Sequence, residues 1–426
     1  MEPIASNITE LELAGGERIF IAPTKAKDVV TLQGSVLGGM AMLPRGKEMV
    51  QSLAVELLDA GTAKMSKDAL REALAARGIA LSFSTGVDRT FFSGSCLPED
   101  FAYLMKTVAE CLAEASFPAK EIALAKERMQ GELEEAKTDT NFRATVALSR
   151  MMYDASHINY GDTVEERMKH LDSVTRADLI SFRKMLGRDG LVVSVAGDIT
   201  PAAAERAIRS AIEKLPKGTT EIPPRKPNQK KPEAKEQLIP ISDKANIDTY
   251  LGVALPINYD HPLYLAFSLF NSMLGARGLS SGHLMSTIRE RDGLTYGIYV
   301  RAGGFAGLAD GYFRIWATFS PATFKIAVEK TRKEIAFFLK NKLTEEGLLA
   351  RKDQFAGAYV VGLSTTGGLA STLHTIGIEG KTLSYIDAYP DLIRAVTLED
   401  LRAVAKLIPF DKLSLAAAGT FEKSAK

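Results

Sequence analysis

The sequence has few of the residues that hold metal ions or disulfide frameworks. Its 426 residues include two cysteines, Cys96 and Cys111, which are too few for a disulfide scaffold or a structural zinc site. The five histidines all lie more than five residues apart, so no helical face carries a pair of imidazole ligands. We therefore expect no catalytic zinc site built on two neighbouring histidines.

The sequence also has no surplus of charge and no long apolar run. The 53 Lys and Arg residues balance 52 Asp and Glu residues, for a net charge of +1. This balance argues against nucleic acid as the main partner, because phosphate binding needs a basic surplus. No stretch reaches the roughly 18 uninterrupted apolar residues of a transmembrane helix, so we expect no membrane span.

What is present is the composition of a folded protein with more than one domain. Apolar residues make up 46% and charged residues 25%, which is typical of globular chains. Six prolines lie between Lys214 and Asp248; because proline fixes φ and removes a donor, this stretch is expected to be a semi-rigid linker. We predict a first domain over 1–215, a linker over 216–247 and a second domain over 248–426.

The two predicted domains carry matching segments. The run Val174-Thr175-Arg176-Ala177-Asp178-Leu179 corresponds to Val396-Thr397-Leu398-Glu399-Asp400-Leu401 at an offset of 222, and the same offset takes Ala196-Gly197 onto Ala418-Gly419. Several matches at one offset indicate duplication of a unit of about 200 residues.

Hydrophobic periodicity predicts the same mixture of elements in both halves. Alternating apolar residues predict paired strands over 80–96, and again over 294–303 with 311–319. Apolar residues at helical spacing predict helices over 48–60, 99–114, 262–274 and 324–341. Short links between adjacent strands favour antiparallel pairing. The predicted fold class is α+β, with two homologous domains that each form a mostly antiparallel sheet with helices packed on one face.

One segment of the second domain combines an arginine with a tyrosine seven residues later. Arg289 lies at the end of a predicted helix that Gly293 should terminate, and Tyr296 begins a strand in which alternation places it with Ile298 and Val300. A guanidinium and a phenol at one point in space are donors that suit a developing oxyanion. The alternative is a structural helix-end arginine and a packed tyrosine.

A glycine-rich segment precedes this pair. Gly275, Gly278, Ser280, Ser281 and Gly282 form a loop in which Gly278 to Gly282 fit the pattern G-x-S-x-G. A serine hydrolase with Ser280 as nucleophile is one interpretation, but the nucleophile elbow requires a preceding strand. The preceding segment 262–274 has helical spacing, which favours a flexible loop between helices.

These features together resemble the pitrilysin and mitochondrial-processing-peptidase family of zinc peptidases. The resemblance covers the duplicated unit, the glycine-rich loop and the segment Ile288-Arg289-Glu290 followed by Gly293-Leu294-Thr295-Tyr296. It implies a clam-shell arrangement in which Arg289 and Tyr296 assist the scissile carbonyl of a bound peptide.

The chain departs from the family at the zinc site. Catalytic members carry H-x-x-E-H shortly before a Gly-Thr pair. Counting back from Gly61-Thr62, the two histidine positions fall on Ser52 and Glu56, and the general-base position falls on Val55. The family's third zinc ligand, a glutamate, falls on Glu132, which is otherwise typical of a solvated helix surface.

The resemblance therefore implies a chain that is inactive alone and has no cofactor. It would act in a heterodimer with a catalytic subunit that carries H-x-x-E-H, binds Zn²⁺ and shares a peptide substrate with it. Alternatives are a scaffold, a peptide-binding protein of the same fold, and the serine hydrolase. Exported relatives suggest a periplasmic location; a signal peptide is not visible in these residues, and the cytoplasm is the alternative.

Overall fold

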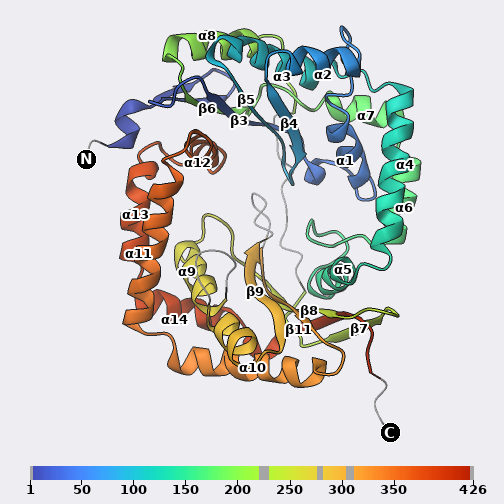
Figure 1. Ribbon diagram of the computed structural model, residues 1–426, viewed down its shortest axis with the longest axis vertical. Coiled ribbons are helices and arrows are strands. Elements are labelled where there is room, and N and C mark those ends of the chain that lie inside the picture. Colours follow the sequence, from blue (N-terminus) through green and yellow to red (C-terminus); the bar gives the residue numbers. More distant parts are fainter. Residues whose placement is uncertain (1–2, 220–229, 276–281, 304–310, 423–426) are drawn as a thin grey trace. The chain divides into compact units, whose positions relative to one another are not determined.

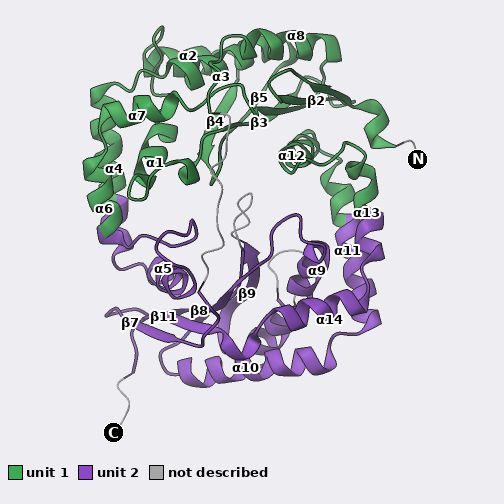
Figure 2. Cartoon of the chain, turned by 180° about the vertical axis from the view of Figure 1, so that it is seen from behind, with its two compact units in different colours: residues 1–131, 166–223, 358–389 green, residues 132–165, 224–357, 390–426 purple. Residues whose placement is uncertain are grey.

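The computed structural model describes residues 3–219, 230–275, 282–303 and 311–422. The chain divides into two compact units, shown in different colours in Figure 2. Unit 1 comprises 1–131, 166–223 and 358–389; unit 2 comprises 132–165, 224–357 and 390–426. Both units therefore contain residues from both halves of the sequence.

Unit 1 is built on a six-stranded sheet with the strand order β1-β2-β6-β3-β5-β4 (Figure 1). Only the β2–β6 pair among these neighbours is parallel; the other pairs are antiparallel. Strand β6 is buried at every position, as expected for a mostly apolar strand covered on both faces; its one polar side chain, Ser194, donates a hydrogen bond to the Ala370 carbonyl. The strands are β1 (Thr9–Glu12), β2 (Arg18–Pro23), β3 (Val30–Leu37), β4 (Ala80–Thr85), β5 (Arg89–Cys96) and β6 (Val192–Gly197).

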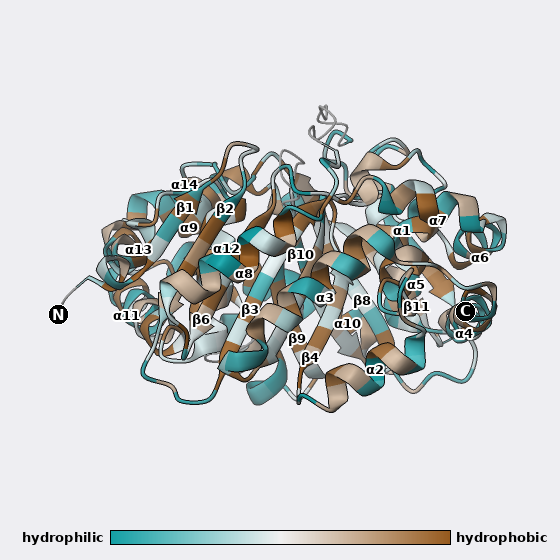
Figure 3. Cartoon of the chain, turned by 90° about the horizontal axis from the view of Figure 1, so that it is seen from above, coloured by the Kyte–Doolittle hydropathy of each residue, from teal (hydrophilic) through white to brown (hydrophobic). Residues whose placement is uncertain are grey.

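Amphipathic helices pack against this sheet. Helix α8 buries Ala204, Ile208 and Ala211 while Glu205 and Arg209 pair on its outer side, and it lies against α3. Figure 3 shows hydrophilic and hydrophobic residues mixed along such helices. The helices of the first 215 residues are α1 (Glu48–Glu56), α2 (Lys67–Ala75), α3 (Phe101–Glu114), α4 (Ala119–Ala136), α5 (Thr140–Met152), α6 (Val164–Ser173), α7 (Arg176–Arg183) and α8 (Pro201–Ile212).

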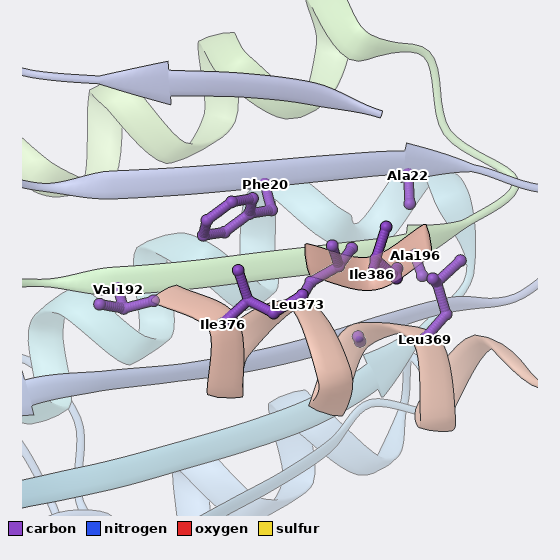
Figure 4. Packing of buried hydrophobic residues seen from close by; sticks show 9 residues of the cluster. Phe20, Ala22, Val192, Ala196, Leu369, Leu373, Ile376 and Ile386 are labelled. Carbon is purple, nitrogen blue, oxygen red and sulfur yellow. The ribbon is translucent and has the colours of Figure 1, made fainter. Parts of the chain in front are cut away.

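A helix from the second half of the sequence completes the core of unit 1. Helix α12 (Thr366–Ile378) packs on β6, β3 and β2. Figure 4 shows its side chains Leu373 and Ile376 near Phe20 of the sheet, and Leu369 beside Ala196. Burying such side chains stabilises the fold by about 1.5–3 kcal/mol each, so α12 is integral to unit 1.

Unit 2 is built on a five-stranded sheet with the order β7-β11-β8-β10-β9. Strand β7 lies inside the predicted linker region and pairs in parallel with β11 at the sheet edge, where a proline is tolerated. The remaining neighbours are antiparallel. The strands are β7 (Glu236–Pro240), β8 (Ile247–Leu255), β9 (Thr295–Gly303), β10 (Gly311–Phe319) and β11 (Ser414–Gly419).

Helix α5, from the first half of the sequence, covers one face of this second sheet. It packs on β11 and β8, where Ala144, Ala147 and Leu148 meet Tyr250 and Ala416. The other helices of this part of the chain are α9 (Tyr264–Leu274), α10 (Phe324–Asn341), α11 (Glu345–Gly362), α13 (Tyr385–Ala395) and α14 (Leu398–Leu407). None of the helices in the described ranges is both long and apolar enough to cross a membrane.

The two sheets correspond strand for strand. Omitting β1, the order β2-β6-β3-β5-β4 matches β7-β11-β8-β10-β9, and each order contains one parallel pair, at the corresponding edge. Thr175 and Thr397 form the same capping box at the starts of α7 and α14. Gly197 and Gly419, the last residues of β6 and β11, have nearly equal φ values of 150° and 152°. This conformation favours glycine. The α+β class and the two homologous domains are confirmed.

Candidate functional site

Arg289 and Tyr296 lie side by side in unit 2. Arg289 lies in a π-helical turn, η4 (Met285–Arg291), which Gly293 ends with a φ of 62°. The guanidinium carbon of Arg289 is 5.5 Å from the centroid of the Tyr296 ring. Both side chains are exposed, Tyr296 to 84%. The pair is therefore positioned to offer N–H and O–H donors to one ligand.

A β-bulge gives Tyr296 this exposure. Strands β9 and β10 change register between Ala317 and Phe319, and the Thr295 hydroxyl donates to the Thr318 carbonyl at 2.6 Å. Bulges redirect side chains. The alternation predicted from the sequence therefore fails at Tyr296, which is exposed while Ile298 is fully buried.

A network of ion pairs fixes the π-helical turn against α10. His283 Nε2 lies 2.8 Å from Glu334, and Arg291 contacts both Glu334 and Asp292 at 2.8 Å. Lys330 also reaches Asp292. Hydrogen bonds from Arg291 lower the pKa of Asp292 to about 2, and burial lowers the pKa of His283.

Arg289 stands outside this network. Its Nη1 is 3.8 Å from the Met285 sulfur, and among the described residues it contacts no carboxylate. Since Arg291 is held by two carboxylates and Arg289 by none, Arg289 is the arginine of this turn that can bind an external ligand.

A cavity of about 720 Å³ adjoins Tyr296 and runs along β9, the outermost strand of the sheet. This volume is within the usual range for ligand sites. Four aromatic residues and two arginines come from the sheet, and helix α9 supplies another wall. Its lining residues are Asn141, Tyr250, Tyr264, Phe267, Ser268, Asn271, Tyr296, Tyr299, Val300, Arg301, Ala302, Arg314 and Trp316.

Hydrogen bonds and stacking fix the aromatic floor of this cavity. Trp316 stacks on Tyr299 with ring centroids 5.2 Å apart, and its Nε1 donates to Asp248 at 2.6 Å. Asn141 also donates to Asp248 and accepts from Tyr250. Burial raises the pKa of Tyr250. Side chains held in this way lose little entropy when a ligand binds.

Gly275 and Gly282, at the two ends of the predicted loop, lie close together beside strand β9. The amide of Val300 donates to the Gly275 carbonyl at 2.7 Å. A Cβ at Gly282 would lie 2.4 Å from the Cα of Gly275, so only glycine fits there. The other predicted loop residues, Gly278, Ser280 and Ser281, lie outside the described residues. Helix α9 precedes them, where a nucleophile elbow would need a strand.

The residues at the zinc positions do not fit a zinc ion. Val55 is buried on α1 and has no donor atom, while Ser52 offers only a hydroxyl, which is absent from the usual zinc ligand sets. Glu56 is exposed and ion-paired with Arg128. The site therefore lacks both imidazoles and the base of the H-x-x-E-H motif.

Glu132, the remaining predicted ligand position, is exposed on helix α4 beside the exposed Glu134 and Glu135. This matches the solvated helix surface that its charged neighbours predict. A carboxylate on such a surface does not by itself make a metal site. The side chains at these four positions therefore give no support for a zinc ion there.

Four residues that line the cavity were not predicted from the sequence: Tyr299, Arg301, Arg314 and Trp316. A signal was available in the strand 311–319, where Tyr312, Arg314 and Trp316 alternate with the buried Phe313 and Ile315. Alternation shows that these polar and aromatic residues share one face, but only the strand pairing shows that Arg301 joins them.

Comparison with known families identifies the class of protein. Residues 55–161 match the family described as insulinase, peptidase family M16, and residues 173–355 match the peptidase M16 inactive domain. Together the matches cover more than half of the chain. The chain belongs to peptidase family M16, and its residues 173–355 are of the inactive-domain type.

Individual relatives agree with this assignment. The chain is 24% identical over 378 residues to an uncharacterised zinc protease of Streptomyces coelicolor, covering 85% of this chain and 79% of that protein. It is 20% identical over 372 residues to the non-peptidase homologue YmxG of Helicobacter pylori, covering 87% and 84%. The inactive-domain match agrees with the missing H-x-x-E-H motif and supports a chain that is not catalytic alone.

A solved structure shares the whole fold. The peptidase M16 inactive domain from Pseudomonas fluorescens superposes with a TM-score of 0.86 at 23% identity, covering 98% of both chains. At this identity the likeness concerns the fold alone. It confirms the predicted architecture of two α+β domains.

Proposed function

We propose that this chain is the non-zinc-binding subunit of a two-chain zinc metalloendopeptidase. One observation carries the proposal. The guanidinium carbon of Arg289 lies 5.5 Å from the ring centroid of Tyr296, and both side chains are exposed beside a cavity. The same chain has Ser52, Val55 and Glu56 at the positions of the zinc motif. A family member that keeps the donor pair but lacks the metal site needs a partner that supplies zinc.

In this proposal the chain acts on the scissile carbonyl of a bound peptide. The Arg289 guanidinium and the Tyr296 hydroxyl donate hydrogen bonds to the carbonyl oxygen as it gains negative charge. Donors fixed before the reaction stabilise an oxyanion without reorganisation. Zinc in the partner would supply a water of lowered pKa, and the partner's sheet edge would hold the peptide as an added strand.

Gly275 and Gly282, the first and last residues of the glycine-rich loop, lie beside β9. We propose that this loop contacts the substrate backbone, because glycine permits close approach. The compartment proposed for the pair is the periplasm.

The test is a reconstitution with an H-x-x-E-H family member from the same genome. The chain alone, the partner alone and the pair would be assayed with a quenched fluorescent peptide. Only the pair should cleave it. Replacing Arg289 by Ala should lower the cleavage rate about 10²–10³-fold, the usual effect of removing one oxyanion donor.

Arg402 on helix α14 provides the matched control, since it is an exposed arginine in the same unit. Arg402→Ala should leave the rate unchanged, and gel filtration should show that both variants still form the pair. A pair that assembles and cleaves at full rate with Arg289→Ala would make the chain a scaffold. Peptide binding without any cleavage by the pair would indicate a binding protein, and cleavage by the lone chain in chelator would point to Ser280.

A further inference from the structure

We propose that the cavity along β9 and β10 binds an acidic side chain of a peptide, with Arg301 and Arg314 as its carboxylate-binding residues. This assignment extends the proposed function, because it describes the class of peptide that the chain accepts. It concerns residues other than Arg289 and Tyr296 and can be tested without a partner chain.

The first observation is a pair of like charges on neighbouring strands. Arg314 of β10 is directly opposite Arg301 of β9 in the sheet register. Like charges directly opposite one another destabilise a sheet. Among the described residues neither guanidinium contacts a carboxylate. An anion between them would remove the repulsion and would accept hydrogen bonds from both planar groups.

The second observation is that Arg314 is held in place before any ligand arrives. Its guanidinium carbon lies 5.2 Å from the ring centroid of Tyr250 and 4.7 Å from that of Tyr312. Cation–π contacts of this kind fix the plane of the guanidinium while leaving its N–H groups available. The side chain thus loses little freedom when it binds a carboxylate.

The third observation is the chemistry of the surrounding walls. Tyr299 and Trp316 stack beside the arginines, and helix α9 contributes Phe267 and Asn271. Asn271 is 6% exposed, and its side-chain oxygen has no hydrogen-bond partner among the described residues. A buried acceptor without a partner is costly, and a peptide N–H group would satisfy it. Aromatic surface, two guanidiniums and an amide favour a peptide over a simple inorganic anion.

The repeat provides an internal comparison. Strand β5 takes the place of β10 in the order of the first sheet. When the last residues of the two strands, Cys96 and Phe319, are aligned, Arg314 and Trp316 correspond to Phe91 and Ser93 of β5. There the cross-strand partners are Ser84 and Ser82, and the hydroxyls of Ser82 and Ser93 are hydrogen-bonded at 2.8 Å. The strand architecture therefore does not require arginines at this place, and their presence in unit 2 points to a ligand.

Trp316 is the sole tryptophan of the chain, so its fluorescence reports directly on this cavity. The full chain would be titrated with two tryptophan-free peptides that differ only in carrying Glu-Phe-Glu or Gln-Phe-Gln. The acidic peptide should bind at least about tenfold more tightly, because its hydrogen bonds are charge-assisted. Its affinity should fall as salt is raised.

Variants then locate the interaction. The double variant R301Q/R314Q should lose the preference for the acidic peptide, and R402Q should keep it. Arg301 is exposed, so R301Q alone tests the site if the double variant fails to fold, and it should lower the preference several-fold.

Three results would overturn the assignment: equal affinity for both peptides, a preference that survives both arginine changes, or displacement of the acidic peptide by inorganic phosphate at matched ionic strength and equal concentration. The last would identify a simple anion site. This measurement is separable from the proposed function, since cleavage of a neutral peptide by the pair depends on Arg289 and Tyr296 and not on the arginines of the cavity.

Discussion

The two units differ most on the pair of strands next to those that pack on the helix taken from the other half of the sequence. Beside α12, strands β4 and β5 of unit 1 present Ser82, Ser93 and Phe91. Beside α5, strands β9 and β10 of unit 2 present Arg301 and Arg314 among aromatic rings. The same strand order thus carries a neutral, hydroxyl-rich surface in one unit and a cationic, aromatic cavity in the other.

This difference shows which features belong to the fold and which to a site. The capping threonines, the glycines of β6 and β11 and the burial of both covering helices are shared, so they serve stability. The arginines and aromatic residues of unit 2 are not shared. A duplicated architecture therefore separates structural from functional residues within a single chain, without any alignment of relatives.

The largest expected effect on stability concerns the covering helices. Leu373 of α12 and Leu148 of α5 are both fully or almost fully buried. If the helices are equivalent, Leu373→Ala and Leu148→Ala should each lower the free energy of unfolding by about 2–5 kcal/mol. Urea unfolding monitored by circular dichroism measures both. A loss at only one position would break the equivalence of the two units.

A second prediction concerns the stability of the two units at low pH. Burial, with a further effect of Arg89, lowers the pKa of His374 in unit 1 to about 4; burial also lowers that of His157 in unit 2 to about 4. A histidine that is neutral when folded but protonated when unfolded stabilises the protein fully above pH 6.5. That stability is lost as the pH falls from about 6.5 to 4.

For His374, which is 6% exposed and hydrogen-bonded to Ser35 at 2.9 Å, the loss amounts to about 3 kcal/mol. Unfolding free energies measured between pH 7 and 4 should therefore fall less steeply for His374→Gln than for the wild type. His157→Gln should flatten the profile in the same window through unit 2. If the pH dependence of the unfolding free energy in either variant equals that of the wild type, the replaced histidine does not contribute to the loss of stability at low pH.

The smallest effect is expected at the duplicated caps. Thr175 and Thr397 each accept a hydrogen bond from the amide of an aspartate three residues later. Thr175→Ala and Thr397→Ala should each cost about 1 kcal/mol. Thermal unfolding of the single and double variants checks whether the two losses are equal and additive. Unequal losses would show that one unit depends more on its helix cap than the other.

Much of the fold could be predicted because it depends on local patterns. The offset of 222 predicted the correspondence of β6 with β11 and of α7 with α14, and the strand pair 294–303 with 311–319 follows from alternation. The exchange of α5 and α12 was not predicted. An amphipathic helix reveals that one face is buried but not which sheet covers it.

The candidate site could be predicted only in part. The spacing of Arg289, Gly293 and Tyr296 predicted their proximity, and the structure brings the two side chains together. The bulge that exposes Tyr296 and the pairing of Arg301 with Arg314 depend on the register between strands. Register depends on how the hydrophobic faces of two strands and the turn between them fit together, so one strand alone does not reveal it. The roles assigned to these residues stay predictions.

The most direct test of the central claim removes one oxygen atom. Tyr296→Phe keeps the ring beside Arg289 and deletes only the hydroxyl that would donate to the oxyanion. In the reconstituted pair, kcat for a neutral peptide should fall about 10²–10³-fold, with KM and assembly unchanged. A Tyr296→Phe pair that assembles normally and turns over at the wild-type kcat would contradict the proposed role of the hydroxyl.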